Sequence, residues 1–346
     1  MKKLIHYEPF VTESGDVIPD LVIAYHTYGT LNEEGDNVIW VCHALTANSD
    51  VEAWWPGMVG RGLMLDTSEH FIVCANILGS CYGTTGPADI NPQTGKPWLK
   101  TFPKITIRDV VNVHEILRKH LCINGIHTII GSSIGGFQAL EYTIMHPDLI
   151  RHLVFIASSV RQTPWTIAFN EAQRLAMEAD ELFRAGDPEG GQRGMKAARA
   201  VALLSYRSAH AYNLTQKDDD DRTDNFRASS YQAYQGDKLV SRFNPYSYYC
   251  ITKLSDTHNI GRGRGSTEKA LSRIRADVLA IGISSDFLFP PADPKFLADN
   301  VEGAEYVEID SLYGHDGFLI ETELITSVVK EFWKNNKEEN YDKKRA

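Results

Sequence analysis

A serine stands between an apolar run and a helix-forming run, in the pattern Gly-x-Ser-x-Gly. The pattern occupies residues 131–135, with the uncharged run 126–130 before it and the helix-forming run 137–142 after it. A serine held at a tight turn between a strand and a helix projects its hydroxyl above the edge of a sheet, where a histidine can remove its proton. We therefore expect Ser133 to act as a nucleophile, although the same pentapeptide also fits a glycine-rich turn without chemistry.

A carboxylate and an imidazole follow two later apolar runs. Asp286 comes just after the run 278–283, and His315 lies in the glycine-containing segment 311–317. In this chain order, Asp286 can accept a hydrogen bond from Nδ1–H of the imidazole while Nε2 takes the proton of the serine. Such a relay implies an acyl-enzyme intermediate. Either residue alone fits a loop hydrogen bond equally well, and the presence of all three in order favours catalysis.

A developing oxyanion needs two backbone N–H donors. One comes from the residue after the nucleophile, here Ile134, and the other comes from a loop after an earlier strand. The segment 43–46 follows the apolar run 38–42 and occupies that position, so we expect Leu45 to supply the second N–H. His43 in the same loop is interpreted as a structural residue rather than as a second base.

Short apolar runs recur along the chain and alternate with helix-like stretches. Several are continuously apolar, which is typical of parallel strands covered on both faces. Strands are expected at 21–25, 38–42, 71–75, 128–130, 153–157, 278–283 and 306–309. Thr106 and Asp109 form a capping-box pattern ahead of a helix. The alternation predicts an α/β fold with a mostly parallel central sheet and helices on both faces.

Residues 162–272 follow a different pattern, with apolar residues at helical spacing and no strand signal. An amphipathic helix is expected over 167–183 and a second over 195–204. Since strand signals resume after this block, we expect it to be a helical cap inserted into a core domain that comprises residues 1–161 and 273–346. Such a cap would cover the serine turn.

Composition and charge fit a globular enzyme. The 346 residues are 43% hydrophobic and 23% charged, with a formal net charge of −10 and a pI near 5.6. An acidic chain is a poor partner for nucleic acid or for an anionic membrane surface. We recognise no export signal and no membrane-spanning run, and the five cysteines lack paired spacing. A reduced, cytoplasmic setting is therefore expected.

Three charged segments are assigned no chemistry. The acidic run 217–222 is interpreted as a solvated loop, because a metal site would need further ligands from elsewhere. The basic, glycine-rich segment 261–265 fits either a phosphate contact or a surface linker, and we favour the linker. The charged end of the chain, 334–346, is expected to fray. No metal site is predicted.

Longer segments resemble one family, the homoserine O-acetyltransferases of methionine biosynthesis within the α/β-hydrolase superfamily. The resemblance runs nearly from end to end of the chain. Its segments are 41–46, 76–87, 102–109, 131–141, 234–238, 283–291 and 313–319. The resemblance implies an α/β-hydrolase fold and the transfer of an acetyl group from acetyl-CoA to the hydroxyl of L-homoserine.

The resemblance also implies which residues hold the amino acid. Arg199 and Tyr206 of the cap and Asp316 beside the histidine match the family's amino-acid ligands, and Thr46 matches a polar residue at the pocket wall. These residue types suit homoserine, because a guanidinium can pair bidentately with its carboxylate and a carboxylate can neutralise its ammonium. Family members are commonly homodimers that associate through the cap helices. No tightly bound cofactor or metal is implied, and acetyl-CoA is the acyl donor.

The chain departs from the family pattern near the serine turn and in the cap. Ser132, Ile134 and Phe137 stand where glycine, methionine and methionine are usual, and Asn244 stands where an aspartate is common. These changes alter the walls of the acyl pocket, so a succinyl donor or an L-serine acceptor stays open as an alternative. A simple esterase and a catalytically inactive binding module are more distant alternatives. The cap arginine and tyrosine argue against the first, and the complete triad argues against the second.

Overall fold

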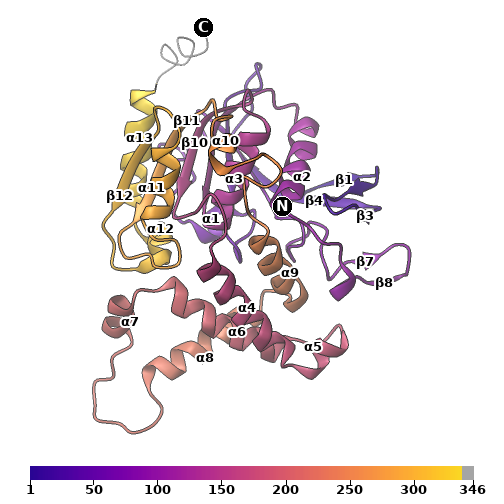
Figure 1. Ribbon diagram of the computed structural model, residues 1–346, viewed down its shortest axis with the longest axis vertical. Coiled ribbons are helices and arrows are strands. Elements are labelled where there is room, and N and C mark those ends of the chain that lie inside the picture. Colours follow the sequence, from indigo (N-terminus) through magenta and orange to yellow (C-terminus); the bar gives the residue numbers. More distant parts are fainter. Residues whose placement is uncertain (337–346) are drawn as a thin grey trace.

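The computed structural model describes residues 1–336, and its centre is an eight-stranded sheet (Figure 1). The strand order is β1-β4-β6-β5-β9-β10-β11-β12. The strands are β1 (Lys2–His6), β4 (Leu21–Tyr28), β5 (Val38–Cys42), β6 (Phe71–Ala75), β9 (Ile126–Ser132), β10 (Ile150–Ile156), β11 (Asp277–Ile283) and β12 (Glu305–Ile309). Most of the charged end predicted to fray, 334–346, lies outside the described residues.

Strands β5, β6 and β9 to β12 run parallel, whereas β4 pairs antiparallel with β1 and with β6. Side chains alternate between the two faces of the sheet. In β5, Val38 and Trp40 join one buried cluster, and Ile39 and Val41 join the other. Every residue of β5 and β11 is buried. The predicted strands and the mostly parallel sheet are confirmed.

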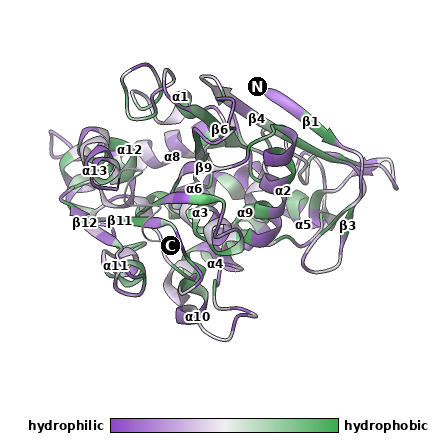
Figure 2. Ribbon diagram, turned by 90° about the horizontal axis from the view of Figure 1, so that it is seen from above, coloured by the Kyte–Doolittle hydropathy of each residue, from purple (hydrophilic) through white to green (hydrophobic). Residues whose placement is uncertain are grey.

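Helices cover both faces of this sheet. On one face lie α2 (Ile107–His120), α3 (Ile134–Met145) and α11 (Ala292–Asp299), and on the other lie α1 (Val51–Trp54), α12 (Gly317–Ile320) and α13 (Thr322–Asn335). Figure 2 shows β1 and β12 at opposite ends of the molecule, as the strand order requires. Helix α2 begins at the predicted capping box, because Thr106 and Asp109 each accept a hydrogen bond from the backbone N–H of the other.

Helices α4 to α10 connect β10 to β11, and they make up the block that the sequence analysis assigned to a cap (Figure 1). Helix α4 packs on α6, and α6 packs on α8. The cap helices are α4 (Pro164–Glu178), α5 (Glu181–Ala185), α6 (Gln192–Tyr206), α7 (Ala209–Thr215), α8 (Arg227–Val240), α9 (Pro245–Asp256) and α10 (Thr267–Leu271). Asn244, at the position where an aspartate is common, caps α9 by accepting from the N–H of Ser247.

The helix predicted over 167–183 is in fact two helices. Helix α4 ends at Glu178, and α5 starts after Asp180, whose side chain accepts from the N–H of Phe183. A local cap therefore overrides the continuous apolar spacing. The predicted cap is also not helical throughout, because residues 216–226 connect α7 to α8 without regular structure. The acidic run lies in this connection, where its arginine pairs with neighbouring aspartates.

The basic loop after α9 is not the free linker that we favoured. Arg264 pairs with Glu141 of α3 at 2.5 Å, and Arg262 pairs with Glu13 at 2.8 Å. Arg108 of α2 contacts both carboxylates, at 2.8 Å to Glu141 and 3.0 Å to Glu13. The loop is therefore fixed by acidic residues that are distant in the sequence, which a local pattern cannot reveal.

Short elements complete the fold. They are β2 (Phe10–Val11), β3 (Val17–Ile18), β7 (Ile90–Asn91), β8 (Lys96–Pro97) and the 3-10 helices η1 (Leu99–Thr101) and η2 (Gly314–Asp316). Strand β2 pairs with β3, and β7 pairs with β8, each as a separate two-stranded sheet. Within residues 1–336, no helix is both long enough and apolar enough to cross a membrane.

Candidate active site

Ser133 occupies a strained turn between β9 and α3. Its backbone has φ 56° and ψ −128°, in the region that favours glycine. Two glycines make this turn possible. A Cβ added at Gly131 would lie 2.1 Å from the carbonyl oxygen of Gly135, and one added at Gly135 would lie 2.1 Å from that of Cys42. The Gly-x-Ser-x-Gly spacing therefore reflects close backbone contacts, and they leave the serine partly exposed at the end of the strand.

His315, which lines a cavity together with Ser133, forms a pair with Asp286. His315 Nδ1 lies 2.7 Å from Asp286 Oδ2, and both residues are buried. The other carboxylate oxygen, Oδ1, accepts from the backbone N–H groups of Leu288 and Phe289, each at 2.9 Å. The carboxylate is thus held at both oxygens, and it orients the imidazole with Nε2 available to another group.

Aromatic rings fix the plane of the imidazole. The rings of Phe289 and Phe318 have centroids 5.3 Å from that of His315, and the ring of Tyr206 is 5.9 Å away. Burial raises the pKa of the Tyr206 hydroxyl, so this group stays protonated at neutral pH. Ser133, His315 and Tyr206 line a cavity of about 510 Å³.

The two expected oxyanion donors lie beside the serine. Leu45 lines this cavity, and both Leu45 and Ile134 line a smaller cavity that also contains Ser133. Neither backbone N–H has a hydrogen-bond acceptor within residues 1–336. Free N–H groups next to a nucleophile are the arrangement that stabilises a developing oxyanion.

His43 braces the loop that presents Leu45. Its Nε2 accepts from the N–H of Ile77 at 3.1 Å, so Nδ1 carries the proton and donates to the carbonyl of Ala44 at 2.9 Å. Burial lowers the pKa of His43 to about 4, and the imidazole is neutral at physiological pH. These contacts fit the structural role that the sequence analysis favoured over a second base.

The structure brings the expected amino-acid ligands into the same cavity as the serine. Its lining includes Thr46, Arg199, Tyr206 and Asp316. The guanidinium carbon of Arg199 lies 5.5 Å from the centre of the Tyr206 ring. Its Nε is buried and has no hydrogen-bond partner among the described residues. A buried donor of this kind is suited to an anionic ligand.

Two further arginines shape the cavity, and the sequence analysis did not assign them a role. Arg207 Nε lies 2.6 Å from Asp316 Oδ2. Arg242 Nη1 donates to the carbonyl of Thr46 and to the hydroxyl of Tyr82, both at 2.6 Å. The first pair holds the aspartate in place, and the second joins the cap to the loop that carries Leu45. Arg207 is adjacent to a predicted ligand, Tyr206, and that adjacency was the available signal.

The smaller cavity at the serine has a volume of about 30 Å³. Its walls include Ile134 and Phe289, and among the described residues it is lined by no lysine, arginine or carboxylate. Phe137 lies behind this wall, stacked on His258 with ring centres 3.9 Å apart and packed edge-on against Phe289. Of the residues that depart from the family pattern, Ile134 lines this small cavity directly and Phe137 packs against its wall.

Comparison with known proteins shows the family. Residues 37–322 match the family model described as alpha/beta hydrolase fold. The chain is 43% identical over 329 residues to the homoserine O-acetyltransferase of Cyclobacterium marinum, an alignment that covers 95% of this chain and 94% of the relative. It is 44% identical over 330 residues to the homoserine O-acetyltransferase of Chlorobaculum tepidum, with 94% and 92% covered. This chain belongs to the homoserine O-acetyltransferase family.

Solved structures place the family on a widely used scaffold. The homoserine O-acetyltransferase from Bacillus anthracis superposes with a TM-score of 0.90 at 26% identity, covering 96% of each chain. Esterase E22 superposes with a TM-score of 0.89 at 21% identity, which shows the shared fold alone. Because a homoserine O-acetyltransferase and an esterase share this scaffold, the residues of the cavity rather than the fold must distinguish transfer from hydrolysis.

Proposed function

We propose that this chain transfers an acetyl group from acetyl-CoA to the hydroxyl of L-homoserine, giving O-acetyl-L-homoserine for methionine biosynthesis. One observation carries the proposal. The cavity that contains Ser133 and His315, the partner of Asp286, also contains Arg199, whose buried Nε has no hydrogen-bond partner among the described residues. The first three residues can form and break an acyl-enzyme, and an arginine beside them can hold an acceptor that carries a carboxylate.

In the first half-reaction, Ser133 Oγ attacks the thioester carbonyl while His315 Nε2 takes its proton. The carbonyl oxygen becomes an oxyanion that accepts from the N–H groups of Leu45 and Ile134. When the intermediate collapses, the carbon–sulfur bond breaks and the imidazolium returns its proton to the departing thiolate. Asp286 stabilises the imidazolium during these steps. The products are free CoA and an acetyl ester on the serine.

In the second half-reaction, His315 Nε2 removes the proton from the homoserine hydroxyl as the hydroxyl attacks the acetyl ester. The second oxyanion uses the same two N–H donors. Its collapse breaks the bond to Ser133 Oγ, which regains a proton from the imidazolium. The acetyl group leaves on the amino acid, and the enzyme returns to its starting state.

Water competes with homoserine for the acetyl-enzyme. Arg199 is proposed to pair with the substrate carboxylate, and Asp316 is proposed to accept from the substrate ammonium. Two fixed charges raise the effective concentration of the hydroxyl at the ester. The cap narrows the access of bulk water to the same point. A simple esterase would have no use for this pair of charges.

The small cavity favours an acetyl donor over a succinyl donor. About 30 Å³ is available beside Ser133, which suits a two-carbon group. A succinyl group placed in this small cavity would bring a second carboxylate against a lining that has no cation among the described residues, and burying an unpaired charge is strongly unfavourable. The steps above use only side chains and backbone N–H groups of the chain together with the two substrates, so acetyl-CoA serves as a substrate and no resident cofactor is invoked.

We also propose a cytoplasmic setting and a homodimer that forms through the cap. Large apolar side chains are exposed on the cap helices. They are Trp165, Leu175, Leu182, Leu204 and Leu214, each more than half exposed. Burial of such a surface in a second copy of the chain would remove it from water. Light scattering of the purified protein tests the proposed homodimer.

The acetyl-enzyme tests the mechanism. Incubation with acetyl-CoA alone is expected to add the mass of one acetyl group to the wild-type protein and none to Ser133→Ala. The matched control is Ser132→Ala, which changes the neighbouring serine of the same turn and should still be acetylated. Acetylation of Ser133→Ala at the wild-type rate, or turnover in that variant, would show that Ser133 is not the nucleophile.

A further inference from the structure

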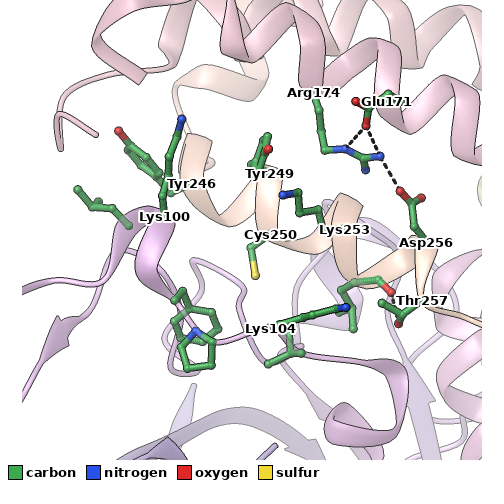
Figure 3. Close-up of a pocket in the computed structure, with 15 residues that line it drawn as sticks. Lys100, Lys104, Glu171, Arg174, Tyr246, Tyr249, Cys250, Lys253, Asp256 and Thr257 are labelled. Carbon is green, nitrogen blue, oxygen red and sulfur yellow. Dashed lines mark hydrogen bonds and ion pairs between the residues drawn. The ribbon is translucent and has the colours of Figure 1, made fainter. Parts of the chain in front are cut away.

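A second cavity lies between the sheet domain and the cap (Figure 3), outside the site of the proposed reaction. It has a volume of about 620 Å³ and is walled by η1 and the segment after it, by α4 and by α9. Among residues 1–336, none lines both this cavity and either of the two cavities at Ser133. We name it the basic cavity after its four cationic side chains, Lys100, Lys104, Arg174 and Lys253.

The charges around the basic cavity are unbalanced. Its two carboxylates, Glu171 and Asp256, are both engaged by Arg174, whose Nη2 lies 2.6 Å from an oxygen of each. The three lysines have no carboxylate partner within the described part of the chain. Two of them instead lie over aromatic rings, at 4.4 Å from the centre of the Phe183 ring and 4.6 Å from that of the Tyr249 ring. The cavity therefore carries a net positive charge.

One nitrogen of Arg174 has no acceptor. The residue is 5% exposed, and its Nη1 is buried without a hydrogen-bond partner among residues 1–336. Figure 3 shows Glu171 and Asp256 paired with Arg174, whose Nε and Nη2 donate to them. Buried donors are normally satisfied, so an unsatisfied one beside a cavity indicates a place for an acceptor.

Helices α4 and α9 separate the basic cavity from the active site. Asn170 lines the small cavity at the serine, whereas Arg174, one helical turn later, lines the basic cavity. Asn170 Nδ2 donates to Asp256 Oδ1 at 2.7 Å, and this bond lies in the wall between the two cavities. A molecule in the basic cavity is therefore not on the path that the acetyl group takes.

We propose that the basic cavity binds a small phosphorylated molecule. Phosphate oxygens are strong acceptors that suit both the free guanidinium nitrogen and the flexible lysine ammonium groups. Phe102, Tyr249 and Leu254 also line the cavity and provide an apolar surface for an organic group attached to the phosphate. Two sources offer this chemistry, a free phosphorylated metabolite and the phosphate-bearing nucleotide end of CoA.

Titration calorimetry with inorganic pyrophosphate tests the site on the full chain. The wild-type protein is expected to bind saturably, and the triple variant Lys100→Ala/Lys104→Ala/Lys253→Ala is expected to bind at least about tenfold more weakly, because charged hydrogen bonds are lost. These lysines are exposed, so the variant should keep the wild-type melting curve. The control Lys119→Ala removes an exposed lysine of α2 and should bind as wild type. Absence of saturable binding to wild type, or equal binding by the triple variant, would overturn the site.

The KM for acetyl-CoA then identifies the source. An unchanged KM in the triple variant, together with weakened pyrophosphate binding, assigns the cavity to a free phosphorylated molecule. A raised KM, together with competition between pyrophosphate and acetyl-CoA, assigns it to the nucleotide end of the donor. In either case acetylation of Ser133 at saturating acetyl-CoA should persist, which separates this result from a failure of the proposed reaction.

Discussion

The core domain and the cap, which both line the active-site cavity, differ in how their polar side chains are held. In the core domain, Asp286 has hydrogen bonds at both carboxylate oxygens, and Ser133 is held between backbone segments that touch at glycines. In the cap, Arg199 has a buried nitrogen without a hydrogen-bond partner among residues 1–336, and Arg242 is an exposed side chain with two contacts to the core. The proposed catalytic groups are held in place by the fold itself, whereas the cap retains hydrogen-bonding capacity that no other described residue satisfies.

This difference suggests that one region carries out the acyl transfer chemistry and the other selects the acceptor. A fixed relay with free oxyanion donors serves any acyl donor that reaches the serine, because it recognises only the reacting carbonyl. An unsatisfied cation gains energy only when a complementary anion binds. We therefore assign formation of the acyl-enzyme to the core and choice of the acceptor to the cap together with Asp316. The predictions below test how rigidly the core is built and which residues bind the acceptor.

The largest effect is expected from the core glycine Gly135. In Gly135→Ala the new methyl would meet backbone atoms of Cys42, with the carbonyl oxygen 2.1 Å away. Backbone cannot yield as a side chain does, so the free energy of unfolding should fall by at least about 3 kcal/mol. Gly186 of the cap has φ 76° and open space around it. Its change to alanine should lower the free energy of unfolding by about 1 kcal/mol. Urea unfolding measures both free energies. Equal losses in the two variants would contradict the contrast between the rigid core and the cap.

A smaller effect is expected from Asp316→Asn, which leaves Arg207 without its carboxylate partner. The KM for homoserine should rise about tenfold to a hundredfold, because a charged hydrogen bond to the ammonium is lost. The rate at which acetyl-CoA acetylates the serine should change little. Asp237→Asn removes an exposed cap carboxylate that pairs with Lys196, and it should leave steady-state kinetics unchanged. A similar loss in both variants would deny Asp316 a role in binding the acceptor.

The smallest effect concerns Asp293 of α11, on the core side. Burial, with the nearby charge of Asp286, raises the pKa of Asp293 from 3.8 to about 6. A folded-state pKa above the unfolded value means that the ionised carboxylate destabilises the fold as pH rises through this range. Asp293→Asn should therefore stabilise the protein by about 1 kcal/mol at pH 8, a figure discounted for partial exposure. The gain should disappear near pH 4. A gain that is independent of pH would show that ionisation of Asp293 is not its cause.

The sheet and the sharp turn at Ser133 were predictable because their signals are local. Strand β5 is a continuous apolar run, β11 is one after its first residue, Asp277, and Ser133 lies between glycines that the turn requires. Strand β1 was not predicted, because its edge position gives it two lysines and a largely exposed pattern. The split between α4 and α5 was also missed, since one capping aspartate outweighs a regular apolar spacing.

Contacts between remote segments could not be predicted from local patterns. Arg207 and Asp316 are 109 residues apart in the chain, and no pattern in either segment indicates that the two residues meet. The same holds for Arg264 and Glu141, which are 123 residues apart and turn an apparent linker into a fixed loop. The sequence predicted which residue types the site needs, and the fold decided which charges meet.

The release of CoA in the first turnover of Arg199→Gln tests the division between core and cap most directly. Mixed with acetyl-CoA alone, this variant should release one CoA per active site as fast as wild type, and its kcat/KM for homoserine should fall about a hundredfold or more. Arg193→Gln, an exposed arginine on the same helix, should match wild type in both measurements. Loss of the CoA burst in Arg199→Gln would show that the cap takes part in acyl-enzyme formation and would contradict the account.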